Sequence, residues 1–199
     1  MEFSADAYHQ ALRFAAQAHG EQRLPGAPLP YLVHLAGVAM EVMATALLPP
    51  GAGALDGSGE AAPFPLQLAA TCALLHDTVE DTQVTAAAIE REFGPAVASI
   101  VAALSKDPQL PKPEQMGDSL RRIAALPAEL ARAAAIVKLA DRITNLQPPP
   151  AHWSLPRRAA YQAEARLILA ELSPLCRWPP LTRRMAERLQ AYSAFLGAP

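Results

Sequence analysis

Residues 66–81 read LQLAATCALLHDTVED, an apolar segment that runs directly into a cluster of ionisable side chains. A helix over residues 66–76 is apolar nearly all round, so it is expected at the centre of the molecule, away from water. The ionisable side chains at its C-terminal end are His76, Asp77, Glu80 and Asp81. Burying charge is costly unless something pairs with it, and a divalent cation is a suitable partner for this set.

The acidic pair Glu80-Asp81 lies one helical turn beyond His76-Asp77. Glu80 is four residues after His76, and Asp81 is four residues after Asp77. If helical geometry persists, the second pair sits above a metal held by the first. A carboxylate in that place activates a water or moves a proton, so we predict Glu80 and Asp81 as the catalytic residues.

Two other segments supply matching metal ligands, His34 and Asp141. His34 lies in an apolar stretch of a predicted helix, where a lone histidine is more often a hydrogen-bonded core residue. Asp141 lies in IVKLADRITNL, residues 136–146, at the spacing for a salt bridge to Lys138 or Arg142 on an exposed stripe. Taken one at a time, these simpler interpretations are favoured.

Taken together, His34, His76, Asp77 and Asp141 form a set of two histidines and two carboxylates on three apolar helices. Mixed nitrogen and oxygen ligands suit Mn²⁺ or another mid-row divalent metal better than a metal that prefers thiolates. The sequence therefore predicts a metal centre made of these four residues. With a water-activating pair beside it, the centre predicts a metal-dependent hydrolase.

The rest of the chain predicts an all-α fold. Apolar periodicity and breaker residues indicate seven more helices, over residues 5–19, 31–48, 86–93, 95–104, 128–146, 155–173 and 180–196. Thr85 is expected to cap the third of these, Gly94 to end it and Pro95 to begin the next. Residues 49–65 are expected to be a flexible loop, and residues 107–118 another loop.

Composition agrees with one packed helical domain. Hydrophobic residues make up 51% of the 199 residues and aromatic residues only 6%, which favours closely packed helices over sheets. We expect a single bundle of about eight helices over residues 1–199. Its core would be about residues 8–170, with the helices of residues 155–196 packing on it.

Net charge and the two cysteines exclude some classes of protein. The net charge is −2, which gives no case for binding nucleic acid or an acidic membrane. Residues 147–199 carry seven Arg and three Glu, either a solvated basic face or a lobe that attracts anions. Cys72 and Cys176 supply no disulfide framework or zinc ribbon.

The first residues, MEFSADAYHQ, lack the features of a signal peptide. No run approaches the roughly 18 apolar residues that span a bilayer. A soluble, cytoplasmic protein is therefore expected, while the sequence leaves its oligomeric state open.

The segments that carry the predicted metal ligands resemble the HD-domain superfamily. More narrowly, they resemble the hydrolase domain of the RelA/SpoT alarmone enzymes and the small alarmone hydrolases of the Mesh1 type. The resemblance rests on His34, on HDTVED at residues 76–81, and on the segments KLADR and Asn145-Leu146. It covers about residues 8–170. It implies an all-helical fold, one Mn²⁺ per chain, and removal of the 3′-pyrophosphate from ppGpp and pppGpp, a small-molecule nucleotide substrate.

The resemblance also implies roles for individual residues. It assigns His34, His76, Asp77 and Asp141 as metal ligands, and Glu80 and Asp81 as the groups that position and activate water. Positions that contact the nucleotide are matched by Asn145 and Tyr161, with Lys106, Lys138 and Arg142 as candidates for phosphate charge.

The loop before His34 departs from the family pattern. It reads Gln22-Arg23-Leu24-Pro25-Gly26, with a single Arg where the family usually shows an Arg-Lys pair. Arg23 is the candidate to stack on the base, because a guanidinium plane packs well on a ring. This departure leaves open a phosphohydrolase acting on NADPH or on an adenine alarmone such as (p)ppApp. A separate alternative is an inactive HD module that binds nucleotide or a partner.

Overall fold

The computed structural model describes residues 3–49 and 63–197. Within them the chain forms ten α-helices and a closing 3₁₀ turn at Ser193–Leu196, with no β-strand. The helices are α1 Ala5–His19, α2 Leu32–Ala46, α3 Leu66–Leu75, α4 Thr78–Asp81, α5 Ala86–Phe93, α6 Pro95–Leu104, α7 Lys112–Ala124, α8 Ala128–Asn145, α9 Leu155–Cys176 and α10 Pro179–Tyr192. The all-α prediction is confirmed. Most of the predicted loop at residues 49–65 lies outside the described residues.

Several helix ends follow from local chemistry that the sequence displays. The hydroxyl of Thr85 accepts a hydrogen bond from the N–H of Ala88 and caps α5, as predicted. Gly94 ends that helix at a φ of +84°, which a side chain would disfavour, and Pro95 begins α6. These two residues turn the chain between α5 and α6, which pack against each other.

The prediction of a loop over residues 107–118 is wrong from Lys112 onward. Residues 112–124 form α7, with Pro113 in its first turn, where a missing N–H costs nothing. Met116, Leu120 and Ile123 recur at helical spacing and are buried, but the prolines and Gly117 conceal that pattern in the sequence. The helix α9 also continues one turn past its predicted end, through Pro174 to Cys176.

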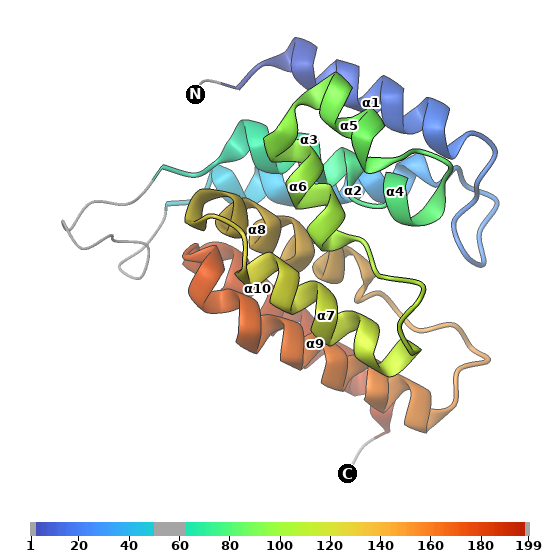
Figure 1. The fold of residues 1–199 in the computed structure, drawn as a ribbon. Coiled ribbons are helices and arrows are strands. Elements are labelled where there is room, and N and C mark those ends of the chain that lie inside the picture. Colours follow the sequence, from blue (N-terminus) through green and yellow to red (C-terminus); the bar gives the residue numbers. More distant parts are fainter. Residues whose placement is uncertain (1–2, 50–62, 198–199) are drawn as a thin grey trace.

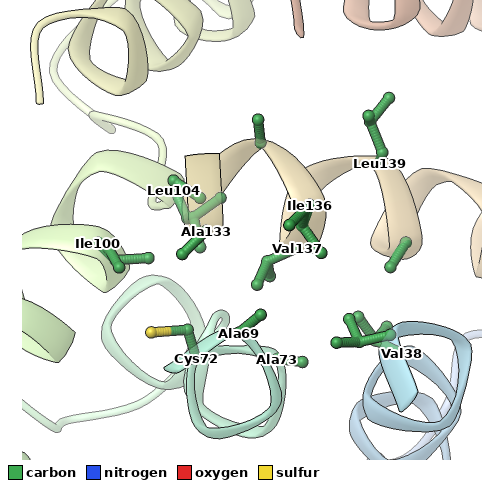
Figure 2. Close-up of a cluster of buried hydrophobic side chains, with 14 of the residues drawn as sticks. Val38, Ala69, Cys72, Ala73, Ile100, Leu104, Ala133, Ile136, Val137 and Leu139 are labelled. Carbon is green, nitrogen blue, oxygen red and sulfur yellow. The ribbon is translucent and has the colours of Figure 1, made fainter. Parts of the chain in front are cut away.

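The helix α8 is the centre of the bundle. It packs against α2, α3, α6, α7, α9 and α10, and every residue from Ala133 to Ile143 is buried. Figure 2 shows Ala133, Ile136 and Val137 of α8 facing side chains of α3, α6 and α2. Small residues at these contacts, such as Ala69 and Ala73 of α3, let the helices approach closely.

The remaining helices cover this centre from opposite sides. In Figure 1, α1 lies along the top of the molecule, and α9 and α10 lie along the bottom. Arginines of the C-terminal segment serve partly as links between helices: Arg184 of α10 pairs with Glu41 of α2, and Arg158 donates to the carbonyl of Phe195. Among the described residues, no helix combines the length and apolar character needed to cross a membrane.

This packing brings three helix ends together. His34 lies in the first turn of α2, His76 and Asp77 directly follow α3, and Asp141 lies in the last turn of α8. The three helices contact one another pairwise. Residues more than a hundred positions apart in the sequence therefore meet at one end of the bundle core.

Candidate metal centre

Four predicted ligand atoms converge between α2, α3 and α8. The Nε2 atom of His34 is 3.3 Å from Asp141 Oδ1 and 3.7 Å from Asp77 Oδ2. The Nε2 atom of His76 is 3.1 Å from Asp77 Oδ2 and 3.7 Å from Asp141 Oδ1. Neighbouring donor atoms bound at about 2.1 Å to one metal lie roughly 3.0–3.5 Å apart, so these four histidine–carboxylate separations are close to those around a single ion.

The orientation of His76 exposes one ring nitrogen to this centre. Its Nδ1 atom is 2.8 Å from the carbonyl oxygen of Ala73, so Nδ1 carries the proton that this carbonyl accepts. Its Nε2 atom is buried and has no hydrogen-bond partner among the described residues, although two carboxylates lie close to it. A buried nitrogen that faces two carboxylates suits a metal ligand, because a cation that displaces its proton would satisfy all three groups together.

The simpler interpretation of Asp141 is wrong in one respect. Asp141, Lys138 and Arg142 are all buried rather than arranged on an exposed stripe. Asp141 does approach Lys138, with 3.6 Å between the ammonium and Oδ2, and it accepts a hydrogen bond of 2.6 Å from the amide of Asn145. Its second oxygen, Oδ1, lies beside both histidines, so the same carboxylate serves the candidate centre.

In this centre, burial and nearby positive groups have opposite effects on the pKa values of the two carboxylates. Burial alone would raise the pKa of the Asp141 carboxyl, but contacts with His34 and His76 and the charge of Lys138 hold it well below its usual value. The pKa of Asp77 is lowered in the same way, chiefly by His76. Both carboxylates therefore stay ionised and available to a cation at neutral pH.

Metal binding is predicted to release about one proton at pH 8. Without a metal, burial disfavours a charged His76, but the charges of Asp77 and Asp141 outweigh burial and raise its pKa to about 10. A metal must displace that proton, so affinity for Mn²⁺ should rise about tenfold per pH unit between pH 7 and 9. Calorimetry in buffers of different ionisation enthalpy measures the proton. Exposed His9 gives the control His9→Gln, and affinity independent of pH would contradict the prediction.

Tyr31 is a member of the site that the sequence analysis missed. Its hydroxyl donates a hydrogen bond of 2.6 Å to Asp77 Oδ2, the oxygen nearest the two histidines. Burial and the nearby charge of Asp77 raise the pKa of Tyr31 above its ordinary value, so the phenol remains a donor. The available signal was its position three residues before His34, one helical turn away.

Replacing Tyr31 with phenylalanine should weaken metal binding by roughly tenfold, because partners that orient a ligand carboxylate typically contribute tenfold to hundredfold in affinity. The ring and its packing are retained, and only the hydrogen bond to Asp77 is lost. Titration of Mn²⁺ followed by electron paramagnetic resonance measures the change. Tyr8→Phe on α1 is the matched control, and unchanged affinity in Tyr31→Phe would show that the hydroxyl does not orient the ligand.

Glu80 and Asp81 lie in α4, a single turn that directly follows the ligands. The N–H of Asp81 donates to the carbonyl of Asp77 at 2.8 Å, so helical geometry does persist across this segment. Glu80 accepts two hydrogen bonds from Lys106, from its backbone N–H at 2.9 Å and from its ammonium at 3.0 Å. Asp81 is exposed, and its Oδ2 accepts a hydrogen bond from the side-chain amide of Gln22 at 3.2 Å.

The candidate phosphate-binding residues differ in accessibility. The side chains of Lys138 and Arg142 are only 6% exposed, whereas that of Lys106 is 37% exposed. Arg142 is held by Glu164, and its guanidinium lies over the ring of Tyr161 at 4.6 Å from the ring centroid. Of these three cations, Lys106 is therefore the one placed to touch a substrate.

The remaining predicted substrate residues lie on two sides of the centre. Asn145 is exposed at the end of α8, and the hydroxyl of Tyr161 lies 3.5 Å from its carbonyl oxygen. Tyr161 also packs edge-on against Trp153. Arg23 lies in the loop between α1 and α2, exposed and paired with Glu21 at 3.1 Å. This loop begins beside Gln22, which bonds to Asp81, and ends at Tyr31, which bonds to Asp77.

The fold and the site are those of a known class. A model of the HD domain family matches residues 11–173 of the chain. The chain therefore belongs to the HD-domain family, as the His76-Asp77 pair and its surroundings predicted.

Within that family the chain is similar to enzymes that carry the name guanosine-3′,5′-bis(diphosphate) 3′-pyrophosphohydrolase. It is 34% identical to the zebrafish Mesh1 enzyme over 157 residues, which is 76% of each chain. It is also 34% identical to the human Mesh1 enzyme over 158 residues, again 76% of each. The solved structure of a metazoan SpoT orthologue that hydrolyses ppGpp matches 99% of this chain and all of its own, with a TM-score of 0.75 and 24% identity.

These similarities confirm the resemblance to Mesh1-type hydrolases and the prediction of an enzyme. At 24% identity the structural likeness bears on the fold alone. The roles of the individual site residues stay predictions, which the geometry described above supports.

Proposed function

We propose that this chain is a Mn²⁺-dependent 3′-pyrophosphohydrolase of ppGpp and pppGpp, which releases pyrophosphate and leaves GDP or GTP. The observation that carries the proposal is the convergence of His34, His76, Asp77 and Asp141 beside the Glu80-Asp81 turn. The names of the zebrafish and human relatives support the substrate. Such an enzyme would lower the level of these alarmones in the stringent response.

The donor set favours Mn²⁺ among the common metals. His34, His76 and Asp77 offer ligand atoms that lie within 4.8 Å of one another, and Asp141 Oδ1 adds a fourth close to both histidines. Two nitrogens and two carboxylate oxygens suit a mid-row divalent ion, whereas Mg²⁺ and Ca²⁺ prefer oxygen alone. Bound here, such an ion would supply a water of lowered pKa and a counter-charge for a phosphoryl oxygen.

The residues beside the centre divide the hydrolytic work between them. Both oxygens of Glu80 are occupied by Lys106, so Glu80 holds that lysine in place. Asp81 has one oxygen held by Gln22, and its other oxygen is the one we assign to take the proton of the attacking water. Asp81 is exposed as a residue, but its carboxylate is partly desolvated by its neighbours. This desolvation and the charge of Asp77 raise the pKa of Asp81 above its usual value, which makes it a better base.

In this reaction water attacks the phosphorus bonded to the 3′-oxygen, and the nucleotide 3′-oxygen leaves. The charge of the pyrophosphate would be met by Lys106 directly and by the buried cations at longer range. The ammonium of Lys106 is held by Glu80 at 3.0 Å. Burial alone would lower the pKa of Lys106, but the negative charge of Glu80 outweighs burial and keeps that pKa above its usual value. Lys138 lies behind Asp141 and offsets its negative charge. A fixed cation near the phosphates stabilises charge that develops as the P–O bond breaks.

A second candidate is hydrolysis of another nucleotide, NADPH or (p)ppApp. The observation that favours it is the placement of Arg23, which is exposed and paired with Glu21 instead of standing next to a second cation. An exposed ion pair of this kind is weak and leaves the side chain free to reorient. The loop therefore carries no group held in place for guanine.

The deciding experiment compares turnover of ppGpp, pppGpp, pppApp and NADPH with Mn²⁺ under identical conditions. The proposal predicts the highest kcat/KM for ppGpp or pppGpp, with pyrophosphate and GDP or GTP as products. Preference for pppApp or NADPH would replace the first candidate with the second. Nucleotide binding without turnover of any substrate would identify the chain as an inactive HD module.

A further inference from the structure

A hydrogen-bonded chain reaches Asp81 from the end of α1. His19 is buried, with 5% of its surface exposed, and its Nδ1 atom lies 2.7 Å from Gln22 Oε1. The amide nitrogen of Gln22 in turn donates to Asp81 Oδ2 at 3.2 Å. His19 and Gln22 come from the helix end and loop before the metal centre, and neither was singled out by the sequence.

The Asp81 carboxylate sets which groups donate and which accept in these two hydrogen bonds. Asp81 accepts only, so Gln22 must turn its NH₂ group toward Asp81 and its carbonyl oxygen toward His19. His19 must then carry a proton on Nδ1 in order to donate to that oxygen. One carboxylate thereby determines the amide orientation of Gln22 and the tautomer of His19.

Stacking on Tyr31 links His19 to the candidate centre. Its ring stacks on Tyr31, with centroids 4.9 Å apart and an interplanar angle of 23°, and Tyr31 holds Asp77. Its Nε2 atom is buried without a hydrogen-bond partner among the described residues. His19, Gln22 and Asp81 also line an open depression of about 530 Å³, together with Ala18, Thr82, Gln83 and Val84.

We propose that His19 and Gln22 are positioning residues, which aim the Asp81 carboxylate at the attacking water through a His19–Gln22–Asp81 hydrogen-bond chain. This inference rests on the proposed hydrolytic function. Asp81 is exposed and lines the depression, and without Gln22 its side chain would turn freely there. Displacement of a catalytic group by about 1 Å costs up to roughly a hundredfold in rate. Loss of the His19–Gln22–Asp81 hydrogen bonds should therefore lower kcat.

Paired substitutions separate positioning from packing. Gln22→Met keeps the length of the side chain and removes both hydrogen bonds. His19→Phe keeps a ring against Tyr31 and removes the donor, whereas His19→Asn keeps a donor near the place of Nδ1 and removes the ring. A structural role for His19 depends on the ring, but a positioning role depends on the donor.

The expected results are changes in kcat with little change in binding. Gln22→Met and His19→Phe should lower kcat by roughly 10- to 100-fold, with KM and Mn²⁺ affinity within about twofold of wild type. His19→Asn should stay within about threefold of wild type. Equal losses in His19→Phe and His19→Asn, or losses that appear in KM or metal affinity, would overturn the inference.

Nitrogen-15 NMR of the histidine rings gives a second readout that needs no turnover. His19 should be the Nδ1–H tautomer in the wild type and should change in Gln22→Met. An Nε2–H tautomer of His19 in the wild type would overturn the proposed His19–Gln22–Asp81 hydrogen bonds. A wild type that hydrolyses no nucleotide overturns the proposed function together with this inference. An active wild type with normal kcat in Gln22→Met overturns this inference alone.

Discussion

Asp77→Asn should reduce nucleotide hydrolysis by at least about 10³-fold, because metal ions contribute several kcal/mol to transition-state stabilisation and each tenfold corresponds to about 1.4 kcal/mol. The substitution keeps the shape of the side chain. It removes the negative charge from the oxygen that lies 3.1 Å from His76 Nε2 and 3.7 Å from His34 Nε2. Affinity for Mn²⁺ should fall with activity, and calorimetry with steady-state kinetics measures both.

The matched control for Asp77→Asn is Asp6→Asn, an exposed residue in the first turn of α1. It should leave both Mn²⁺ affinity and turnover at the wild-type value. Thermal unfolding followed by circular dichroism separates loss of metal from loss of fold. A folded Asp77→Asn protein that retains turnover with bound Mn²⁺ would remove Asp77 from the centre.

Asp81→Asn should lower kcat by roughly 10²- to 10⁴-fold, the usual contribution of a general base, while Mn²⁺ affinity stays within about twofold. A base acts only when it is deprotonated. Wild-type kcat at saturating metal should therefore fall as the pH drops toward the pKa of Asp81. Without a metal, desolvation and the charge of Asp77 raise that pKa, and a bound cation would counter the second effect. The acid limb of the pH–rate profile should disappear in Asp81→Asn.

Glu80→Gln is the informative comparison for Asp81→Asn. Glu80 is occupied by Lys106, so its substitution should raise KM by loosening that lysine and should leave the acid limb in place. If Glu80→Gln abolishes the acid limb and Asp81→Asn does not, the two carboxylates exchange their assigned roles. Full activity in both variants would show that neither residue takes the proton.

The parts of the fold that the sequence predicted are those controlled by local chemistry. The apolar run of α3, the cap at Thr85 and the Gly94-Pro95 junction each act through neighbouring residues. The helix α7 was missed because Pro113 and Gly117 normally interrupt helices, and its buried face becomes recognisable only when it packs on α6 and α8. Tertiary packing overrides propensity there.

The metal ligands of the candidate site could be predicted because their residue types form a recognisable sequence pattern. The residues that orient them were harder to predict, because they act through contacts between distant parts of the sequence. His76-Asp77 and the following turn stand together in the sequence, whereas the burial of Asp141 depends on α8 being surrounded by six helices. Tyr31 and Gln22 donate hydrogen bonds to carboxylates 46 and 59 residues away, and His19 contacts Gln22. One sequence offers no means of pairing such distant residues.

Anomalous diffraction at the manganese edge, from crystals grown with Mn²⁺, tests whether the four ligands hold one metal. We predict one strong peak per chain, roughly 2.0–2.4 Å from Nε2 of His34, Nε2 of His76 and the carboxylate oxygens of Asp77 and Asp141. A peak at another place, or no peak in a protein that still hydrolyses ppGpp, would contradict it.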